Sequence, residues 1–242
     1  AAVLIGLGKS IAELKAEGYL PSNMDGASLP EETAIAVKAA VLPFARFRTP
    51  EGVVVDSLLS PEMRSTGEVM GLDKHYDTAF AKAQAGAGSP LPTSGKVFIS
   101  VANHDKRNVI IYAKMLESLG FEIVSTGGTA EILRRNGLNS VIVASKFAEA
   151  NGDHSIVDMV RNGDIDLILN TPAGGAARSD GYEIRAAAVS VGCPVMTTIS
   201  EFAAAVQAIN ALREHSWDIM SLQEHGVQLA AAVDARSEGG EA

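Results

Sequence analysis

The chain has 242 residues, of which 47% are hydrophobic and 20% charged, an ordinary balance for a globular protein. Its formal net charge of -9 argues against a protein that binds nucleic acid regardless of sequence, because such binding needs a basic face. Cys193 is the only cysteine, which excludes an intrachain disulfide and favours a reducing, cytoplasmic location. No apolar run reaches the roughly 20 residues of a membrane span, so we expect no membrane partner.

The first third of the chain has a mixed pattern. Its predicted elements are, in chain order, a helix over 2–17 that ends at Gly18, a strand in the second half of 33–44, extended segments at 53–56 and after Glu62, and a helix over 77–85. The stretch 86–95 is dense in glycine, proline and serine, which predicts a boundary between a region 1–90 and a region 91–242. Because the sequence starts at Ala1 inside an amphipathic pattern, we expect a fragment of a larger protein.

After residue 95, strands and helices alternate regularly. Strands are predicted at 97–101, 121–124, 140–143, 165–169 and 194–197, and helices at 105–119, 129–136, 155–161, 181–191 and 201–214, with Asp105 and Asp153 as helix caps. This alternation predicts an α/β fold, a Rossmann-like parallel sheet of five strands with helices on both faces. Trp217 and Ile219 are expected to dock on this domain, and the small, polar residues from about 236 to be disordered.

Polar residues follow four of the predicted strands. They are Ser100 with Lys106, the run 125–129, Lys146, and Asn170 with Thr171. Ligands of an open parallel sheet bind in the crevice outside the carboxyl ends of its strands. Hydroxyl, amide and ammonium groups gathered there predict a pocket for a small phosphorylated anion.

The run Thr126-Gly127-Gly128-Thr129 is the sharpest local motif. Glycines between a strand and a helix let the backbone approach a phosphate, and the N–H groups and dipole of the helix start favour an anion. An ordinary turn that needs positive φ at a glycine explains the run equally well. Lys106, expected in the first turn of the preceding helix, would supply the counter-charge.

Other motifs in the sequence depart from the catalytic or metal-binding patterns that they resemble. Gly6-Leu7-Gly8-Lys9-Ser10 ends like a P-loop, but Val3 stands where the first glycine belongs. The five histidines are scattered without metal-ligand spacing, and there is no Gly-x-Ser-x-Gly elbow. Asp153 and His154 could act as acid and base, although a helix cap at Asp153 is the favoured interpretation. We therefore predict neither catalytic nor metal-binding residues.

Three segments resemble one enzyme family closely. They are 37–44, 61–71 and 80–84, and they look like the closing strands and the exit helix of the second ATP-grasp unit of the carbamoyl-phosphate synthase large chain. The resemblance covers nearly the whole chain. It implies that 1–90 is a partial α+β remnant of that unit, and that residues from about Gly95 onward form a methylglyoxal-synthase-like allosteric domain.

The resemblance also implies a ligand. In the family, this domain binds uridine monophosphate as an inhibitor and inosine monophosphate as a second ligand. The residues that would hold the nucleotide are Ser100, Lys106, Thr126, Gly128, Thr129, Lys146, Asn170 and Thr171. The phosphate would lie near Lys106, Thr126 and Thr129, whereas Pro172 replaces the hydroxyl that usually follows Asn-Thr.

A second effector site departs from the family pattern. Ornithine activates the family between the ATP-grasp unit and the allosteric domain. Leu42 and Thr197 match that site, but Ala39 replaces its usual glutamate. We therefore expect weak ornithine binding or none.

The remaining implications concern the parent enzyme, a ligase that makes carbamoyl phosphate for pyrimidine and arginine biosynthesis. ATP, Mg²⁺ (or Mn²⁺) and K⁺ would act upstream of Ala1, so the fragment itself is expected to hold no cofactor and to be inactive. Its partners would be the nucleotide, the upstream ATP-grasp domains and the glutaminase small subunit, and a homo-oligomer is possible.

Two enzymes with the same sheet type are alternatives. Methylglyoxal synthase, a lyase, uses an aspartate and a histidine; Asp153 falls near its aspartate, but 171–181 contains no histidine. The cyclohydrolase of purine synthesis shares the Ser-Thr-Gly-Gly-Thr turn, but its characteristic continuation is missing here. A binding module without catalytic activity remains the preferred prediction.

Overall fold

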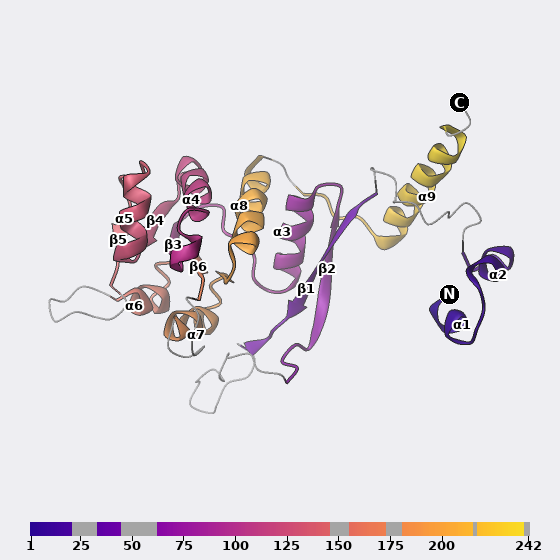
Figure 1. Cartoon of the computed structure of the whole chain (residues 1–242), viewed down its shortest axis with the longest axis horizontal. Helices are drawn as coiled ribbons and strands as arrows, with labels where there is room; N and C mark the ends of the chain where they lie inside the picture. The colour runs from indigo at the N-terminus through magenta and orange to yellow at the C-terminus, as the bar shows by residue number, and fades with distance from the viewer. Residues whose placement is uncertain (21–32, 45–61, 146–154, 173–180, 215–216, 240–242) are drawn as a thin grey trace. The chain divides into compact units, whose positions relative to one another are not determined.

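The computed structural model describes residues 1–20, 33–44, 62–145, 155–172, 181–214 and 217–239, and Figure 1 labels their helices and strands. The chain forms two compact units. One unit combines residues 1–34 with 219–242, and the other spans Ile35–Asp218. The predicted extended segment at 53–56 lies outside the described residues.

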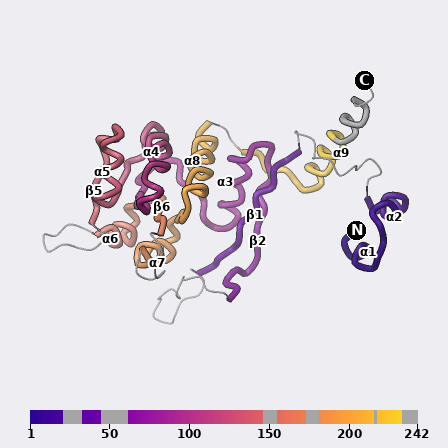
Figure 2. The backbone as a smooth tube through the Cα atoms, viewed as in Figure 1, coloured from indigo at the N-terminus to yellow at the C-terminus, as the bar shows by residue number. Residues whose placement is uncertain are grey.

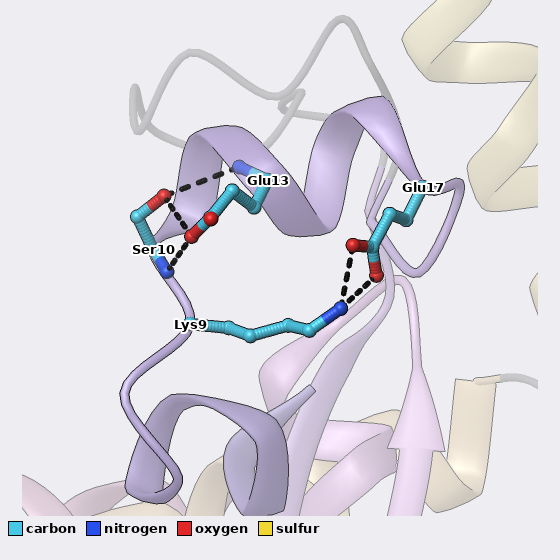
Figure 3. Close-up of polar contacts among 4 residues, drawn as sticks. All are labelled: Lys9, Ser10, Glu13 and Glu17. Carbon is cyan, nitrogen blue, oxygen red and sulfur yellow. Dashed lines mark hydrogen bonds and ion pairs between the residues drawn. The ribbon is translucent and has the colours of Figure 1, made fainter.

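The first unit begins with two short helices, α1 (Ala2–Gly6) and α2 (Ile11–Ala16), so the prediction of one helix over 2–17 is wrong. The backbone leaves the helical region at Gly8, where φ is 97°. Ser10 then starts α2 with a capping box, in which Ser10 Oγ accepts from the Glu13 N–H at 3.3 Å and the Glu13 carboxylate accepts from the Ser10 N–H at 2.8 Å (Figure 3). Gly18, at φ 76°, ends α2 as predicted.

The C-terminal part of the first unit is a helix that the sequence analysis did not predict. This helix, α9 (Leu222–Gly239), includes the first four residues of the segment expected to be disordered. Ile219, just before it, belongs to the same unit as α9, so its docking on the other unit stays a prediction, and Trp217 is 40% exposed. Within the described ranges, the helices are too short or too polar to cross a bilayer.

The second unit contains a five-stranded sheet. Its strands are β3 (Lys96–Ser100), β4 (Glu122–Ser125), β5 (Ile142–Val143), β6 (Leu167–Asn170) and β7 (Val195–Met196), in the order β5-β4-β3-β6-β7. Every neighbouring pair is parallel. The helices that follow the five strands are α4 (Val109–Ser118), α5 (Gly127–Arg135), α6 (Ile156–Arg161), α7 (Tyr182–Val191) and α8 (Ile199–Glu214).

The sheet buries both of its faces. Successive side chains of a strand point to opposite faces, and in β3 Val97 and Ile99 join one core while Phe98 joins the other. The first core includes residues of α4, α5 and α8, and the second includes residues of α6 and α7. This arrangement confirms the predicted α/β fold with helices on both faces.

An antiparallel pair of strands and a helix precede this sheet in the same unit. β1 (Ile35–Val41) pairs with β2 (Gly67–Asp73), and α3 (Tyr76–Gly86) lies against both. Gly71 permits the contact, because a Cβ atom there would lie 2.0 Å from the Ala79 carbonyl oxygen of α3. Figure 2 shows α3 beside α8, and Phe80 of α3 joins the first core. The division of the chain at about residue 90 stays a prediction.

The helix starts at the carboxyl edge of the sheet differ from the predicted ones. Asn103–Asp105 forms a 3-10 turn, and α4 begins only at Val109, so Asp105 does not cap it. α5 begins at Gly127, two residues before the predicted start. Ser155, and not Asp153, caps α6, since its side chain accepts from the Asp158 N–H at 3.2 Å.

Candidate functional site

The site lies where the strand order changes direction. From β3 the chain proceeds to β4 and β5 on one side, and then returns to β6 and β7 on the other. Such a switch point leaves a crevice outside the carboxyl ends of the strands, where ligands of this fold class bind. Ser100 ends β3 and is in register with Asn170, which ends β6. The structure thus brings two of the predicted residues to the crevice.

The end of β4 adds a hydroxyl to the same place. Ser100 Oγ lies 3.2 Å from Thr126 Oγ1, the hydroxyl of the residue that follows β4. Ser125 faces the other way, because its buried hydroxyl donates to the Ile99 carbonyl at 2.6 Å. Of the two hydroxyls at this strand end, only that of Thr126 is directed to the crevice.

The first turn of α5 is open at its N-terminus. Thr126 is the N-cap residue, yet its side chain makes no capping hydrogen bond. Within the described part of the chain, the N–H groups of Gly127 and Gly128 make no hydrogen bond. Neither glycine has positive φ, so the interpretation of the run as a turn that needs positive φ is wrong. The open N–H groups and the helix dipole favour an anion here.

Lys106 supplies a cation beside this helix start. A Cβ atom on Gly128 would lie 3.3 Å from Lys106 Nζ, so the ammonium group is close to the first turn of α5. Lys106 itself follows the 3-10 turn and precedes α4. The expectation that it lies in the first turn of α4 is therefore wrong.

Two buried threonines hold the loop after β3. Thr129 Oγ1 accepts from the Val101 N–H at 3.4 Å, and Thr171 Oγ1 accepts from the Ala102 N–H at 2.8 Å. Both side chains are almost fully buried. Because this loop leads to Lys106, the two hydroxyls fix the backbone from which the lysine extends.

Asn170 has a partner that the sequence analysis missed. Arg185, in the first turn of α7, donates to Asn170 Oδ1 at 2.7 Å. Asn170 Nδ2 in turn donates to the Ser100 carbonyl at 3.5 Å. The sequence feature that could have identified Arg185 is its charge, because a cation in the first turn of a helix opposes the helix dipole and calls for an explanation.

The remaining predicted residues fall into two groups. Lys146, Asp153 and His154 are outside the described residues. Leu42 follows β1, and Thr197 follows β7 with its N–H donating to Glu201 Oε2 at 3.1 Å. No hydrogen bond joins Leu42 to Thr197 in the described ranges, and Ala39 lies in β1 opposite Val69.

Two titratable groups near the sheet have raised pKa values. Burial raises the pKa of the Cys193 thiol to about 12, with a smaller contribution from the charge of Asp166. Burial also raises the pKa of Glu201, partly offset by the hydrogen bond from the Thr197 N–H. Among the described residues, no cluster of three metal-ligating side chains is present.

A comparison with protein families finds one match in this unit. Residues 108–197 match the family model described as the MGS-like domain. This part of the chain is similar to MGS-like domains. The matched range includes Thr126, Gly128, Thr129 and Asn170, and it starts just after Ser100 and Lys106.

Similar curated proteins share one name. The chain is 67% identical to the carbamoyl phosphate synthase large chain of Kocuria rhizophila over 93% of this chain and 20% of that protein. It is 60% identical to the one of Paenarthrobacter aurescens over 97% of this chain and 22% of that protein, and 53% identical to the one of Streptomyces griseus over 97% and 21%. The chain thus spans about a fifth of the length of these relatives, and the predicted resemblance to the C-terminal part of this large chain is confirmed.

Proposed function

We propose that this chain is the regulatory region of a carbamoyl phosphate synthase large chain. Its crevice would bind a nucleoside monophosphate, with uridine monophosphate as inhibitor, and would thereby control carbamoyl phosphate synthesis. The observation that supports this most directly is the position of the Lys106 ammonium group beside the open first turn of α5. The high identity to synthase large chains supports the parent activity.

The phosphate would bind between Lys106 and α5. The ammonium group, the uncapped helix start and the Thr126 hydroxyl all favour negative charge or an acceptor oxygen. A hydrogen bond to a charged group contributes about 1.5–3 kcal/mol.

The rest of the crevice is too wide for phosphate alone. Its polar groups extend across the ends of three neighbouring strands, from Thr126 after β4 to Asn170 in β6. Since neighbouring strands are about 4.8 Å apart, these ends span roughly 10 Å. The Ser100 hydroxyl and the Asn170 amide would then serve the ribose or the base. Lys146 and the Thr171 backbone would complete the site.

The parent enzyme would be cytoplasmic and would perform the chemistry elsewhere. ATP, Mg²⁺ (or Mn²⁺) and K⁺ would bind in the ATP-grasp domains, and ammonia would come from the glutaminase small subunit. The product would feed pyrimidine and arginine biosynthesis. Nucleotide binding would change that activity by a coupling free energy of about 1–3 kcal/mol. Ornithine would bind weakly or not at all, since Ala39 offers no carboxylate.

A calorimetric and thermal-shift comparison tests the proposal. The 242-residue chain is titrated with uridine monophosphate, uridine, inorganic phosphate and ornithine. We expect the nucleotide to bind most tightly and to raise the melting temperature; a ligand at 100 times its Kd stabilises by about 2.7 kcal/mol. No stabilisation by uridine monophosphate would refute the proposed inhibitor site. Release of phosphate from dihydroxyacetone phosphate would instead support the lyase alternative.

A further inference from the structure

We infer that Arg185 is a positioning residue that fixes the side-chain amide of Asn170, so that Asn170 directs its Nδ2 donor toward the crevice. This inference rests on the proposed function and assigns a role to a residue that the family resemblance did not supply. Arg185 and Asn170 come from different elements, α7 and β6, and meet at the switch point of the sheet.

The chemistry of the pair determines the orientation of the amide. The two ends of an asparagine amide have nearly the same shape, so the amide orientation follows from its hydrogen-bond partners. A guanidinium group has donors and no acceptor, so the atom that faces it at 2.7 Å must be Oδ1. Nδ2 is therefore the end directed toward the Ser100 carbonyl, at 3.5 Å.

The nitrogen retains capacity for a ligand. Nδ2 has two hydrogens, and its bond to the Ser100 carbonyl is at the long limit for a hydrogen bond. Asn170 is nearly buried, so its amide has little access to water in compensation. A ligand oxygen that approaches the end of β6 would meet an N–H donor, whereas the amide oxygen of Asn170 faces Arg185.

Gly181 lies close to both Asn170 and Arg185. It is the N-cap residue of α7 with φ 72°, and its carbonyl accepts from the Arg185 N–H at 3.1 Å. A Cβ atom on Gly181 would lie 2.1 Å from Asn170 Oδ1 and 2.9 Å from an Arg185 guanidinium nitrogen. Only glycine leaves space for the pair, so Gly181 and Arg185 act on the same amide.

The location of the pair predicts a selective effect. Asn170 ends β6, while Lys106 and α5 lie beyond β3 at the end of β4. Loss of the fixed amide should therefore weaken binding of the nucleoside part and leave binding of inorganic phosphate unchanged. If Arg185 only stabilised the fold, its loss would weaken the binding of the nucleotide and of inorganic phosphate together.

Charge variants of the whole chain provide the first test. Calorimetry with uridine monophosphate and with inorganic phosphate is compared for Arg185→Met, Arg185→Lys and the control Arg161→Met. We expect Arg185→Met to weaken the nucleotide about tenfold with phosphate affinity unchanged, which is the size of one hydrogen bond. Arg185→Lys, which still donates, should recover most of the loss. The control removes the same charge at the C-terminal end of α6 and should change neither affinity.

Glycine variants provide a matched steric test. Gly181→Ala and Gly192→Ala both place alanine at positive φ, 72° and 74°, at the two ends of α7, but only the first would collide with Asn170 and Arg185. Their stabilities should fall alike, whereas only Gly181→Ala should weaken the nucleotide. Equal nucleotide affinities in the two variants would overturn the inference.

Nuclear magnetic resonance separates this inference from the proposed function. In the ligand-free chain, the Asn170 side-chain amide should give one pair of signals in the wild type and in Arg185→Lys, and two pairs or broadened signals in Arg185→Met. If the wild type binds no nucleotide, the proposed function fails, and these signals still decide the role of Arg185. Identical amide signals in all three proteins would refute it.

Discussion

The central and edge strands of the sheet differ in the helices that follow them. The central strands β4, β3 and β6 lead to α5, α4 and α7, and in the described part of the chain the side chains of their N-cap residues make no capping hydrogen bond. The edge strands β5 and β7 lead to α6 and α8, where Ser155 and Thr198 accept backbone N–H groups at 3.2 Å. The difference coincides with the position of the crevice.

This contrast indicates where the sheet can hold an anion. A capping side chain satisfies N–H groups that would otherwise seek a partner. At the edges the chain supplies that partner itself. At the centre Thr126 is suited to cap α5, yet its hydroxyl faces Ser100, so the first turn of α5 remains open to a ligand.

The largest expected effect comes from the cation beside the open helix. Lys106→Ala should weaken uridine monophosphate about thirtyfold, because a charge-assisted hydrogen bond of roughly 2 kcal/mol is lost. Calorimetry measures this, and the melting-temperature gain from the nucleotide should mostly disappear. Lys114→Ala, which removes an exposed charge of α4, is the matched control and should bind normally. Unchanged affinity in Lys106→Ala would place the lysine outside the site.

A pair of hydroxyl deletions tests the contrast between capped and open helices. Ser155→Ala should lower the free energy of unfolding by about 1 kcal/mol, because it removes the cap of α6. Thr126→Ala should cost clearly less stability, since its side chain does not cap α5, but should weaken the nucleotide. Urea denaturation and calorimetry measure the two properties. Equal losses of stability would show that Thr126 does cap α5 in solution.

Two glycines in the first turn of α5 separate helix stability from binding. Gly127→Ala and Gly128→Ala should each stabilise the helix by up to about 0.5–1 kcal/mol, because both backbones are free of positive φ. A Cβ atom on Gly127 meets nothing within 4 Å, while one on Gly128 meets Lys106 Nζ. Only Gly128→Ala should therefore weaken the nucleotide, by several-fold. Equal nucleotide affinities in the two variants would mean that a methyl group on residue 128 does not disturb the position of the Lys106 ammonium group.

The smallest expected effect concerns α8, the capped helix that follows the edge strand β7. Glu201, in the first turn of α8, has a pKa raised by burial above its ordinary value of 4.5. The folded state therefore prefers the protonated form, and stability is lost as pH rises through the raised pKa. Glu201→Gln should raise the melting temperature slightly at pH 7, and the gain should vanish at pH 4. The control is Glu183→Gln, an exposed acid in the first turn of α7; an equal gain there would exclude burial as the cause.

The sequence determined the architecture and the identity of most polar groups at the strand ends. Buried strands such as β6 are short and apolar up to their last residue, and glycines such as Gly120 and Gly163 mark helix ends through positive φ. The alternation of strands and helices is therefore local information. The carboxyl ends of parallel strands must share one edge, which predicted that Ser100, Thr126 and Asn170 would be neighbours.

Tertiary structure decided what each of these groups does. Helix starts shifted by two to four residues, as at Gly127 and Val109, because local capping rules compete with contacts that form only across the sheet. The Thr126 hydroxyl could have capped its own helix, and only its proximity to Ser100 shows otherwise. Arg185 is 15 residues from Asn170 along the chain, and a hydrogen bond over that separation depends on how α7 packs against β6, which no local pattern encodes.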